Sequence, residues 1–131
     1  MSRRILVIDD DEIVLRLIQR CLGSEYALTT VTCGSEALDL LARQEPYDVV
    51  LCDLLLADMA GEQLYEELLD FHPAQARRMA LMTSGRDLPE FRDFIRRFDG
   101  CLLAKPFEVS ELRRTVEVVL SRAALRDSPR P

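Results

Sequence analysis

Hydrophobic and polar positions follow a regular order along this chain, in which short apolar runs alternate with longer stretches of helical spacing. The short runs place aliphatic side chains on consecutive positions, which is typical of strands buried on both faces. We expect these strands at residues 5–8, 26–31, 48–52, 79–82 and 101–104. The stretches that follow them predict helices at residues 13–22, 35–43, 61–70, 89–98 and 110–120.

Strands that alternate with helices in this way predict right-handed βαβ units. Because the strands are apolar throughout, helices are expected on both faces of the sheet. The fold class is therefore α/β, with a doubly wound five-stranded parallel sheet and five helices. The chain turns polar from Ser121 onward and ends in proline. We expect a domain at residues 3–122, followed at 123–131 by a tail or the start of a linker.

The sequence also predicts where the last helix begins, where the first helix ends and which side of the first helix is apolar. Ser110 is the expected N-cap of the last helix, because its hydroxyl can accept a hydrogen bond from the first turn. In the first helix, Gly23 supplies the stop. The apolar side chains of that helix expected to face the core are Ile13, Val14, Leu17, Ile18, Cys21 and Leu22.

The composition excludes several classes of protein. The chain has 131 residues and a mass of 15.0 kDa, which suits one domain. No apolar run approaches the roughly 20 residues of a membrane span, and acids follow the first apolar run too soon for a signal peptide. The net charge of −6 disfavours a nucleic-acid surface. We expect a cytoplasmic protein with no membrane and no direct nucleic-acid partner.

The cysteines do not indicate a metal or disulfide framework. They lie far apart in the sequence and form no C-x-x-C pair, whereas a zinc site needs closely spaced ligands. A disulfide framework would need a secreted context. We expect free, buried or half-buried thiols in a reducing cytosol at Cys21, Cys33, Cys52 and Cys101.

Chemically distinctive residues stand at the predicted strand ends. In open parallel α/β sheets, ligands bind outside the carboxyl ends of the strands. Lys105 is the only lysine of the chain, which suggests a specific need for a compact ammonium. The residues at the ends of the first, third, fourth and fifth strands are Asp9, Asp10 and Asp11, then Asp53, then Thr83 and Ser84, then Lys105.

This set of residues predicts a phosphoryl-transfer site. Converging carboxylates repel one another and have raised pKa values unless a cation joins them. Oxygen ligands with open water positions favour Mg²⁺. A hydroxyl and an ammonium suit the oxygens of a phosphoryl group. The pattern therefore indicates Mg²⁺ and a phosphoryl group held over a carboxylate nucleophile.

Simpler interpretations exist for each residue. Acids after a strand usually solvate a loop or favour the start of a helix, and for Asp11 and Glu12 that interpretation is preferred. Thr83 can be an ordinary helix cap. Asp53 directly follows an apolar strand, where a carboxylate without a role is costly.

With these residues in view, the chain resembles the receiver domain of bacterial two-component response regulators over about residues 3–122. The resemblance implies the flavodoxin-like strand order 2-1-3-4-5. It also implies a signalling domain rather than an enzyme, one that catalyses only its own phosphorylation and dephosphorylation. The segments that carry it are Leu6–Asp11, Asp48–Asp53, Met82–Gly85 and Lys105–Phe107.

The resemblance assigns roles to individual residues. Asp53 is the implied phosphoacceptor, which takes a phosphoryl group from a kinase phosphohistidine. Mg²⁺, or Mn²⁺ in its place, is ligated by Asp10, Asp53 and the Leu55 backbone carbonyl, with Asp9 helping through water. The remaining implied roles are Lys105 pairing with phosphoryl oxygens, Thr83 hydrogen-bonding one of them, and a cis peptide bond before Pro106.

The resemblance also implies partners: a sensor histidine kinase or histidine phosphotransfer protein, and a downstream protein target on a switched surface. We expect that surface at the fourth helix, fifth strand and fifth helix. Residues 53–66, together with 82–85, further resemble receivers attached to hybrid histidine kinases, and a phosphorelay fits this likeness.

Departures from the family pattern carry their own expectations. Leu56–Ala57 replaces the frequent Met–Pro, so we expect a less rigid loop. Leu102 replaces an aromatic residue, so little rotamer change is expected there on activation. Leu55 and Gly85 offer no hydrogen bond to an attacking water, which predicts slow dephosphorylation.

Three alternatives stay open at this point. A haloacid-dehalogenase-like Mg²⁺-dependent phosphatase uses D-x-D after its first strand, with Asp9 as nucleophile and Asp11 completing the motif. A flavodoxin-like FMN carrier would share the sheet but needs a Ser/Thr/Gly-rich phosphate loop. A degenerate receiver would act only as a binding scaffold.

Overall fold

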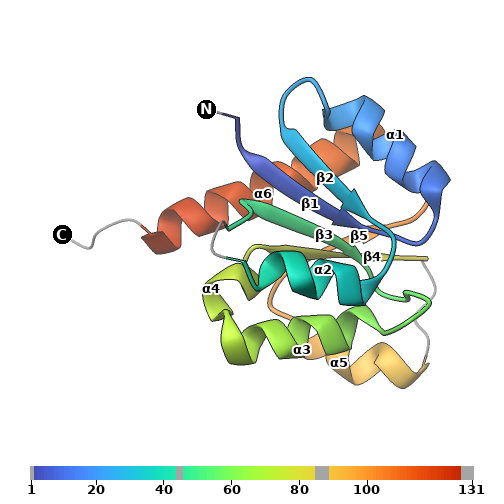
Figure 1. Ribbon diagram of the computed structural model, residues 1–131, viewed down its shortest axis with the longest axis vertical. Helices are drawn as coiled ribbons and strands as arrows, with labels where there is room; N and C mark the ends of the chain where they lie inside the picture. Colours follow the sequence, from blue (N-terminus) through green and yellow to red (C-terminus); the bar gives the residue numbers. More distant parts are fainter. Residues whose placement is uncertain (1, 44–45, 85–88, 128–131) are drawn as a thin grey trace.

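The computed structural model describes residues 2–43, 46–84 and 89–127 and has a five-stranded parallel sheet at its centre (Figure 1). The strand order is β2-β1-β3-β4-β5, which confirms the expected doubly wound topology. Each neighbouring pair is parallel and in continuous register. The strands are β1 (Arg4–Ile8), β2 (Ala27–Val31), β3 (Val49–Asp53), β4 (Met79–Thr83) and β5 (Cys101–Ala104).

Helices cover both faces of the sheet, as the apolar strands require. Figure 1 shows α1 and α6 on one face and α2, α3, α4 and α5 on the other. The helices are α1 (Glu12–Leu22), α2 (Gly34–Leu41), α3 (Gly61–Phe71), α4 (Pro73–Ala76), α5 (Arg92–Arg97) and α6 (Val109–Asp127). A 3₁₀ turn, η1 (Pro89–Phe91), leads into α5.

The two faces of β1 belong to two separate cores. Leu6 and Ile8 pack with the residues of α2, α3 and α5, whereas Ile5 and Val7 pack with those of α1 and α6. All four side chains are completely buried. Successive strand residues point to opposite faces, so a run of four apolar residues fills both cores at once.

The expected core face of α1 is partly wrong. Ile13 is 75% exposed and Leu17 is 44% exposed, while the helix buries Leu15, Ile18 and Leu22. Each residue turns an α-helix by about 100°, so a position two residues from Leu15 lies roughly on the opposite side. The apolar side of α1 is therefore wider than the face that packs on the sheet, and the residues at 13 and 17 face solvent.

The two ends of the last helix and the number of helices also differ from expectation. α6 begins at Val109, so Ser110 lies inside its first turn and is not the N-cap; the Glu108 backbone N–H instead donates to Glu111 Oε1 at 3.0 Å. α6 continues to Asp127, past the expected helix end at residue 120, with Ala123 still buried. The one-turn helix α4, which begins at Pro73, raises the number of α-helices to six in the part of the chain that the structure describes.

The thiols are free, with Cys52 buried and Cys21, Cys33 and Cys101 half-buried, as expected. Within the described ranges, no helix has the length and apolar character needed to cross a membrane.

Candidate functional site

Three carboxylates meet where β1 and β3 end. Ile8 pairs with Cys52 in the parallel register, so the chain leaves the sheet at the same edge in both strands. The residues that follow are Asp9 and Asp10 after β1, and Asp53 as the last residue of β3. One oxygen of each carboxylate lies within 4.8 Å of the others. The expectation that strand ends gather these side chains is confirmed.

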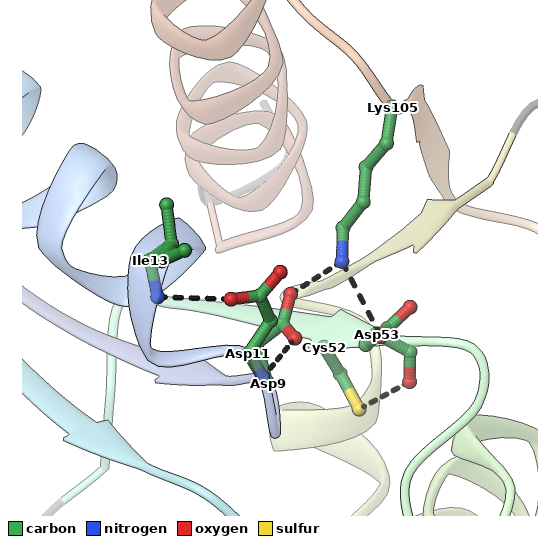
Figure 2. A network of polar contacts seen from close by, with 6 residues as sticks. All are labelled: Asp9, Asp11, Ile13, Cys52, Asp53 and Lys105. Carbon is green, nitrogen blue, oxygen red and sulfur yellow. Dashed lines mark hydrogen bonds and ion pairs between the residues drawn. The ribbon is translucent and has the colours of Figure 1, made fainter.

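Lys105 places an ammonium between two of these carboxylates (Figure 2). Its Nζ lies 2.5 Å from Asp9 Oδ2 and 3.3 Å from Asp53 Oδ2. The Lys105 backbone N–H donates to the Thr83 carbonyl at 2.6 Å, directly after the last pair of the β4–β5 register. The Lys105–Pro106 peptide bond is cis, as the resemblance implies. The ends of β1, β3 and β5 therefore supply the charged groups of a single site, and the end of β4 holds Lys105 through its backbone.

The first two acids of the β1 end have different surroundings. Asp9 is completely buried, and its Oδ1 accepts a hydrogen bond from the Asp11 N–H at 2.9 Å. Asp10 is exposed and is free to approach an ion from the solvent side. Asp11 is the N-cap of α1, where its Oδ1 accepts from the Ile13 N–H at 2.9 Å. The helix-start interpretation of Asp11 is thus confirmed.

The electrostatics of the site favour the binding of a cation in addition to the Lys105 ammonium. Burial, together with the charge of Asp9, raises the pKa of Asp53 above its ordinary value, although Lys105 opposes this shift. Burial by itself lowers the pKa of Lys105, but hydrogen bonding to Asp9 and the charge of Asp53 outweigh it and raise the pKa. The site therefore holds three carboxylates and one ammonium, which pairs with two of them, and a further positive charge would relieve the repulsion between the carboxylates.

The thiol nearest the site is not a nucleophile. Cys52 is completely buried, and its Sγ donates to the Asp53 backbone carbonyl at 3.2 Å (Figure 2). Burial and the charge of Asp53 raise the pKa of Cys52 far above its ordinary value, so the thiolate does not form near neutral pH.

The loop after Asp53 folds back on itself before α3 begins. Leu55 and Ala60 form an antiparallel bridge, and the Gly61 N–H donates to the Leu54 carbonyl at 2.7 Å. A side chain at Gly61 would place its Cβ 2.7 Å from the Asp53 carbonyl oxygen, so only glycine allows this approach. The loop therefore keeps a defined path beside Asp53 although it lacks the Met–Pro pair.

The remaining predicted residues lie near the same edge or just outside it. Thr83 ends β4 and is partly buried, and Ser84 lines a hollow beside Lys105 and Phe107. Leu102 is 44% exposed and lines a groove between β5 and α6. Gly85 lies outside the described residues, and the expectation for Leu102 on activation stays a prediction.

The residues present fit a magnesium ion. The candidate donors are the carboxylate oxygens of Asp9, Asp10 and Asp53, and the neighbouring Cys52 sulfur is turned to a backbone carbonyl. Hard oxygen donors suit Mg²⁺ or Mn²⁺ rather than a soft metal. A bound divalent ion would supply positive charge to the oxygens of a phosphoryl group.

One residue that sequence reasoning missed is Asp58, in the loop between β3 and α3. Its carboxylate accepts hydrogen bonds from the backbone N–H groups of Gly34 and Ser35, at the start of α2. No local pattern marks this contact, because its partners lie more than twenty positions earlier in the chain.

Comparison with known proteins identifies the family of the chain. The family profile of the response regulator receiver domain matches residues 5–117, and the chain belongs to that family. It is 31% identical over 99% of its length to the DNA-binding transcriptional regulator NtrC of Escherichia coli K12. It is 29% identical over 95% of its length to the transcriptional regulatory protein ZraR of Klebsiella oxytoca. The chain spans 28% of the length of each of these two relatives.

Solved structures share the fold. A response regulator receiver domain from Clostridium thermocellum superposes with a TM-score of 0.82 at 23% identity, over 95% of this chain and 98% of that one. A structure described as an adenylate cyclase from Rhodopirellula baltica gives a TM-score of 0.84 at 23% identity, over 96% and 93%. At these identities the likeness extends to the fold alone.

Proposed function

We propose that Asp53 accepts a phosphoryl group from a phosphohistidine in a reaction that depends on Mg²⁺. The observation that carries this proposal is the position of the Asp53 carboxylate, 3.3 Å from the Lys105 ammonium and within 4.8 Å of Asp9 and Asp10. The donor is a sensor histidine kinase or a histidine phosphotransfer protein. Phosphorylation then switches a surface that binds a downstream protein.

The step requires a carboxylate that is both accessible and charged. An Asp53 oxygen attacks the phosphorus and forms an acyl phosphate, while the P–N bond breaks. The departing imidazole keeps the electron pair of that bond and takes up a proton from solvent. The Asp53 side chain is 15% exposed, so a donor can reach it without unfolding the site.

Lys105 and Thr83 act on the product. The ammonium is held by Asp9 at 2.5 Å, so it stays in place when the charge on Asp53 changes. A phosphoryl group on Asp53 adds oxygens that can accept from this ammonium. Thr83, whose carbonyl accepts the Lys105 N–H, lies on the adjacent strand end and offers a hydroxyl to the same oxygens.

The donor protein is proposed to dock beside the site on α1. Ile13 and Leu17 are exposed on this helix, and Leu17 borders a hollow that also includes Val14, Lys105 and Phe107. Exposed apolar side chains at one place often mark a protein-binding surface. A partner seated on this surface would be close enough to present a phosphohistidine to Asp53.

The phosphatase alternative is less well supported. It requires Asp9 as nucleophile, but this residue is completely buried and both of its oxygens are engaged, by Lys105 and by the Asp11 N–H. The binding-scaffold alternative leaves the combination of Asp53, Lys105 and the acidic cluster without a role. We therefore retain the phosphoacceptor role of Asp53 as the single proposal. In this proposal the protein acts in the cytoplasm, through contacts with other proteins rather than by direct contact with nucleic acid.

Incubation with acetyl phosphate tests this function without a cognate kinase. Intact-mass analysis should show the addition of one phosphoryl group that needs Mg²⁺ and is removed by hydroxylamine, as expected for an acyl phosphate. Asp53→Asn should abolish the addition, whereas Asp39→Asn, at an exposed site on α2, should not. Equal phosphorylation of wild type and Asp53→Asn would overturn the proposal.

A further inference from the structure

The loop that connects β3 to α3 is tied to a different part of the chain by one side chain. Asp58 Oδ1 accepts the Gly34 N–H at 2.8 Å, and Asp58 Oδ2 accepts the Ser35 N–H at 2.9 Å. Both carboxylate oxygens are thus used on two consecutive backbone groups at the start of α2. This bidentate arrangement fixes direction as well as distance.

The helix that receives Asp58 has no side-chain cap of its own. Its N-cap residue is Cys33, whose side chain makes no capping hydrogen bond. The first N–H groups of a helix lack intrahelical partners, and a negative charge is favourable there. Asp58, in a distant loop, supplies both the acceptors for these N–H groups and the negative charge. The hydrogen bonds from Gly34 and Ser35 lower the pKa of its carboxyl.

Side-chain packing strengthens the same connection. A Cβ built on Gly34 would lie 2.4 Å from Met59 Cγ and 2.5 Å from its Sδ, so the Met59 side chain occupies the space above Gly34. Two adjacent loop residues, Asp58 and Met59, therefore hold the start of α2 by a polar and an apolar contact.

The tied residues are coupled to the residues around Asp53 by backbone hydrogen bonds. The Leu56 N–H donates to the Met59 carbonyl at 3.1 Å, and Leu55 bridges to Ala60. The Gly61 N–H closes the loop on the Leu54 carbonyl. The position of Leu55 thus depends on the position of Asp58 and Met59. Alanine at 57 does not lock φ, whereas a proline there would fix it at about −65°.

We propose that Asp58 is a positioning residue for the metal site: by tying the loop to α2, it fixes the Leu55 carbonyl relative to Asp53 and strengthens Mg²⁺ binding. This inference rests on the proposed function, because it assumes that the Leu55 carbonyl is a metal ligand. Asp58 itself does not contact the ion. Its contribution is to hold in advance a backbone group that the ion would otherwise have to order.

The test compares Asp58→Ala and Asp58→Asn with Asp39→Ala, which removes the same charge from an exposed position on α2. Calorimetric titration gives the Mg²⁺ dissociation constant, and amide hydrogen exchange in metal-free protein reports Leu56 and Gly61. We expect Asp58→Ala to weaken Mg²⁺ binding roughly tenfold, in the range found for groups that orient metal ligands. Both loop amides should exchange faster. Asp58→Asn keeps one acceptor and should give intermediate values.

A capping role alone would give a different result. In that case α2 would lose protection and the melting temperature would fall, but the Mg²⁺ dissociation constant and the exchange of Leu56 and Gly61 would match wild type. That outcome overturns the inference. If wild type binds no Mg²⁺, the proposed function fails. Amide exchange at Leu56 and Gly61 then still tests whether Asp58 holds the loop in place. Faster exchange in Asp58→Ala supports this role, and unchanged exchange overturns it.

Discussion

Lys105 Nζ lies 2.5 Å from Oδ2 of Asp9, a residue that precedes it by 96 positions and is completely buried. The pair joins the ends of β1 and β5, which are not neighbours in the sheet. The same ammonium lies 3.3 Å from Asp53, on the strand next to β1. A single side chain therefore links the charge on Asp53 to a buried carboxylate, which makes this contact central to the stability of the site.

Removal of Lys105 should destabilise the metal-free protein. Lys105→Met leaves Asp9 buried without its cation, and breaking such a pair typically costs several kcal/mol. Because the Lys105 side chain is 20% exposed, we expect a smaller loss of about 2 kcal/mol in the free energy of unfolding. Urea denaturation in the presence of a chelator measures it.

A double variant provides the control for this prediction. Asp9→Asn combined with Lys105→Met removes the buried charge as well as its partner, so it should recover most of the lost stability. A single Lys105→Met variant as stable as wild type would contradict the account, as would a double variant that loses the sum of both single effects.

Mg²⁺ binding should weaken in acid. The ion needs ionised carboxylates, and burial raises the pKa of Asp53 above its ordinary value. Affinity should therefore be constant well above this raised pKa and fall as the pH drops through it. Calorimetric titrations over a pH series measure this dependence. Asp58 is unaffected in that range, because its pKa is lowered. Affinity that stays constant into acid would contradict a role for Asp53 as ligand.

The raised pKa of Asp53 also determines how its ionisation affects the stability of the folded protein. A carboxyl whose pKa is raised by folding destabilises the folded state when it ionises. In metal-free protein near neutral pH, Asp53→Asn should therefore be at least as stable as wild type. Added Mg²⁺ should stabilise wild type and leave Asp53→Asn nearly unchanged.

The exposed apolar residues of α1 should affect the rate of phosphotransfer from a protein donor but not from a small-molecule donor. Replacing Ile13 and Leu17 by serine should slow phosphotransfer from a histidine kinase at least several-fold, because apolar contact area is lost. Phosphorylation by acetyl phosphate should keep its wild-type rate. Leu125→Ser is a suitable control, since Leu125 is 78% exposed on α6. Equal slowing with both donors would indicate damage to the site instead.

The lifetime of the phosphorylated state should depend on Leu55. This side chain is 44% exposed, follows Asp53 by two positions and has no polar group to orient an attacking water. Leu55→Asn should release phosphate several-fold faster than wild type, because placing the water contributes to hydrolysis. Leu69→Asn, at a position 41% exposed on α3, controls for a general effect. No change in Leu55→Asn would show that this residue does not limit hydrolysis.

The sequence predicted what depends on local pattern and on the rules of parallel sheets. Ile5 to Ile8 form a buried strand because all four side chains are apolar, and the strand-end rule then brings Asp9, Asp53 and Lys105 together. Helix orientation was less predictable, because the apolar side of α1 is wider than its buried face and periodicity alone could not tell Leu15 from Ile13. The tie from Asp58 to Gly34 and Ser35 joins distant segments, and no local pattern encodes it.

Chemical reduction of the phosphorylated protein identifies the carboxylate that carries the phosphoryl group. Borohydride reduces an acyl phosphate to an alcohol, so treatment of the phosphorylated protein converts the modified aspartate to homoserine. Peptide mass mapping then locates that residue. If Asp53 is the phosphoacceptor, homoserine is expected at position 53 only, dependent on Mg²⁺ and on prior exposure to the phosphodonor. Homoserine at Asp9 or Asp10, or none at Asp53 in protein that has gained a phosphoryl group, would contradict that role.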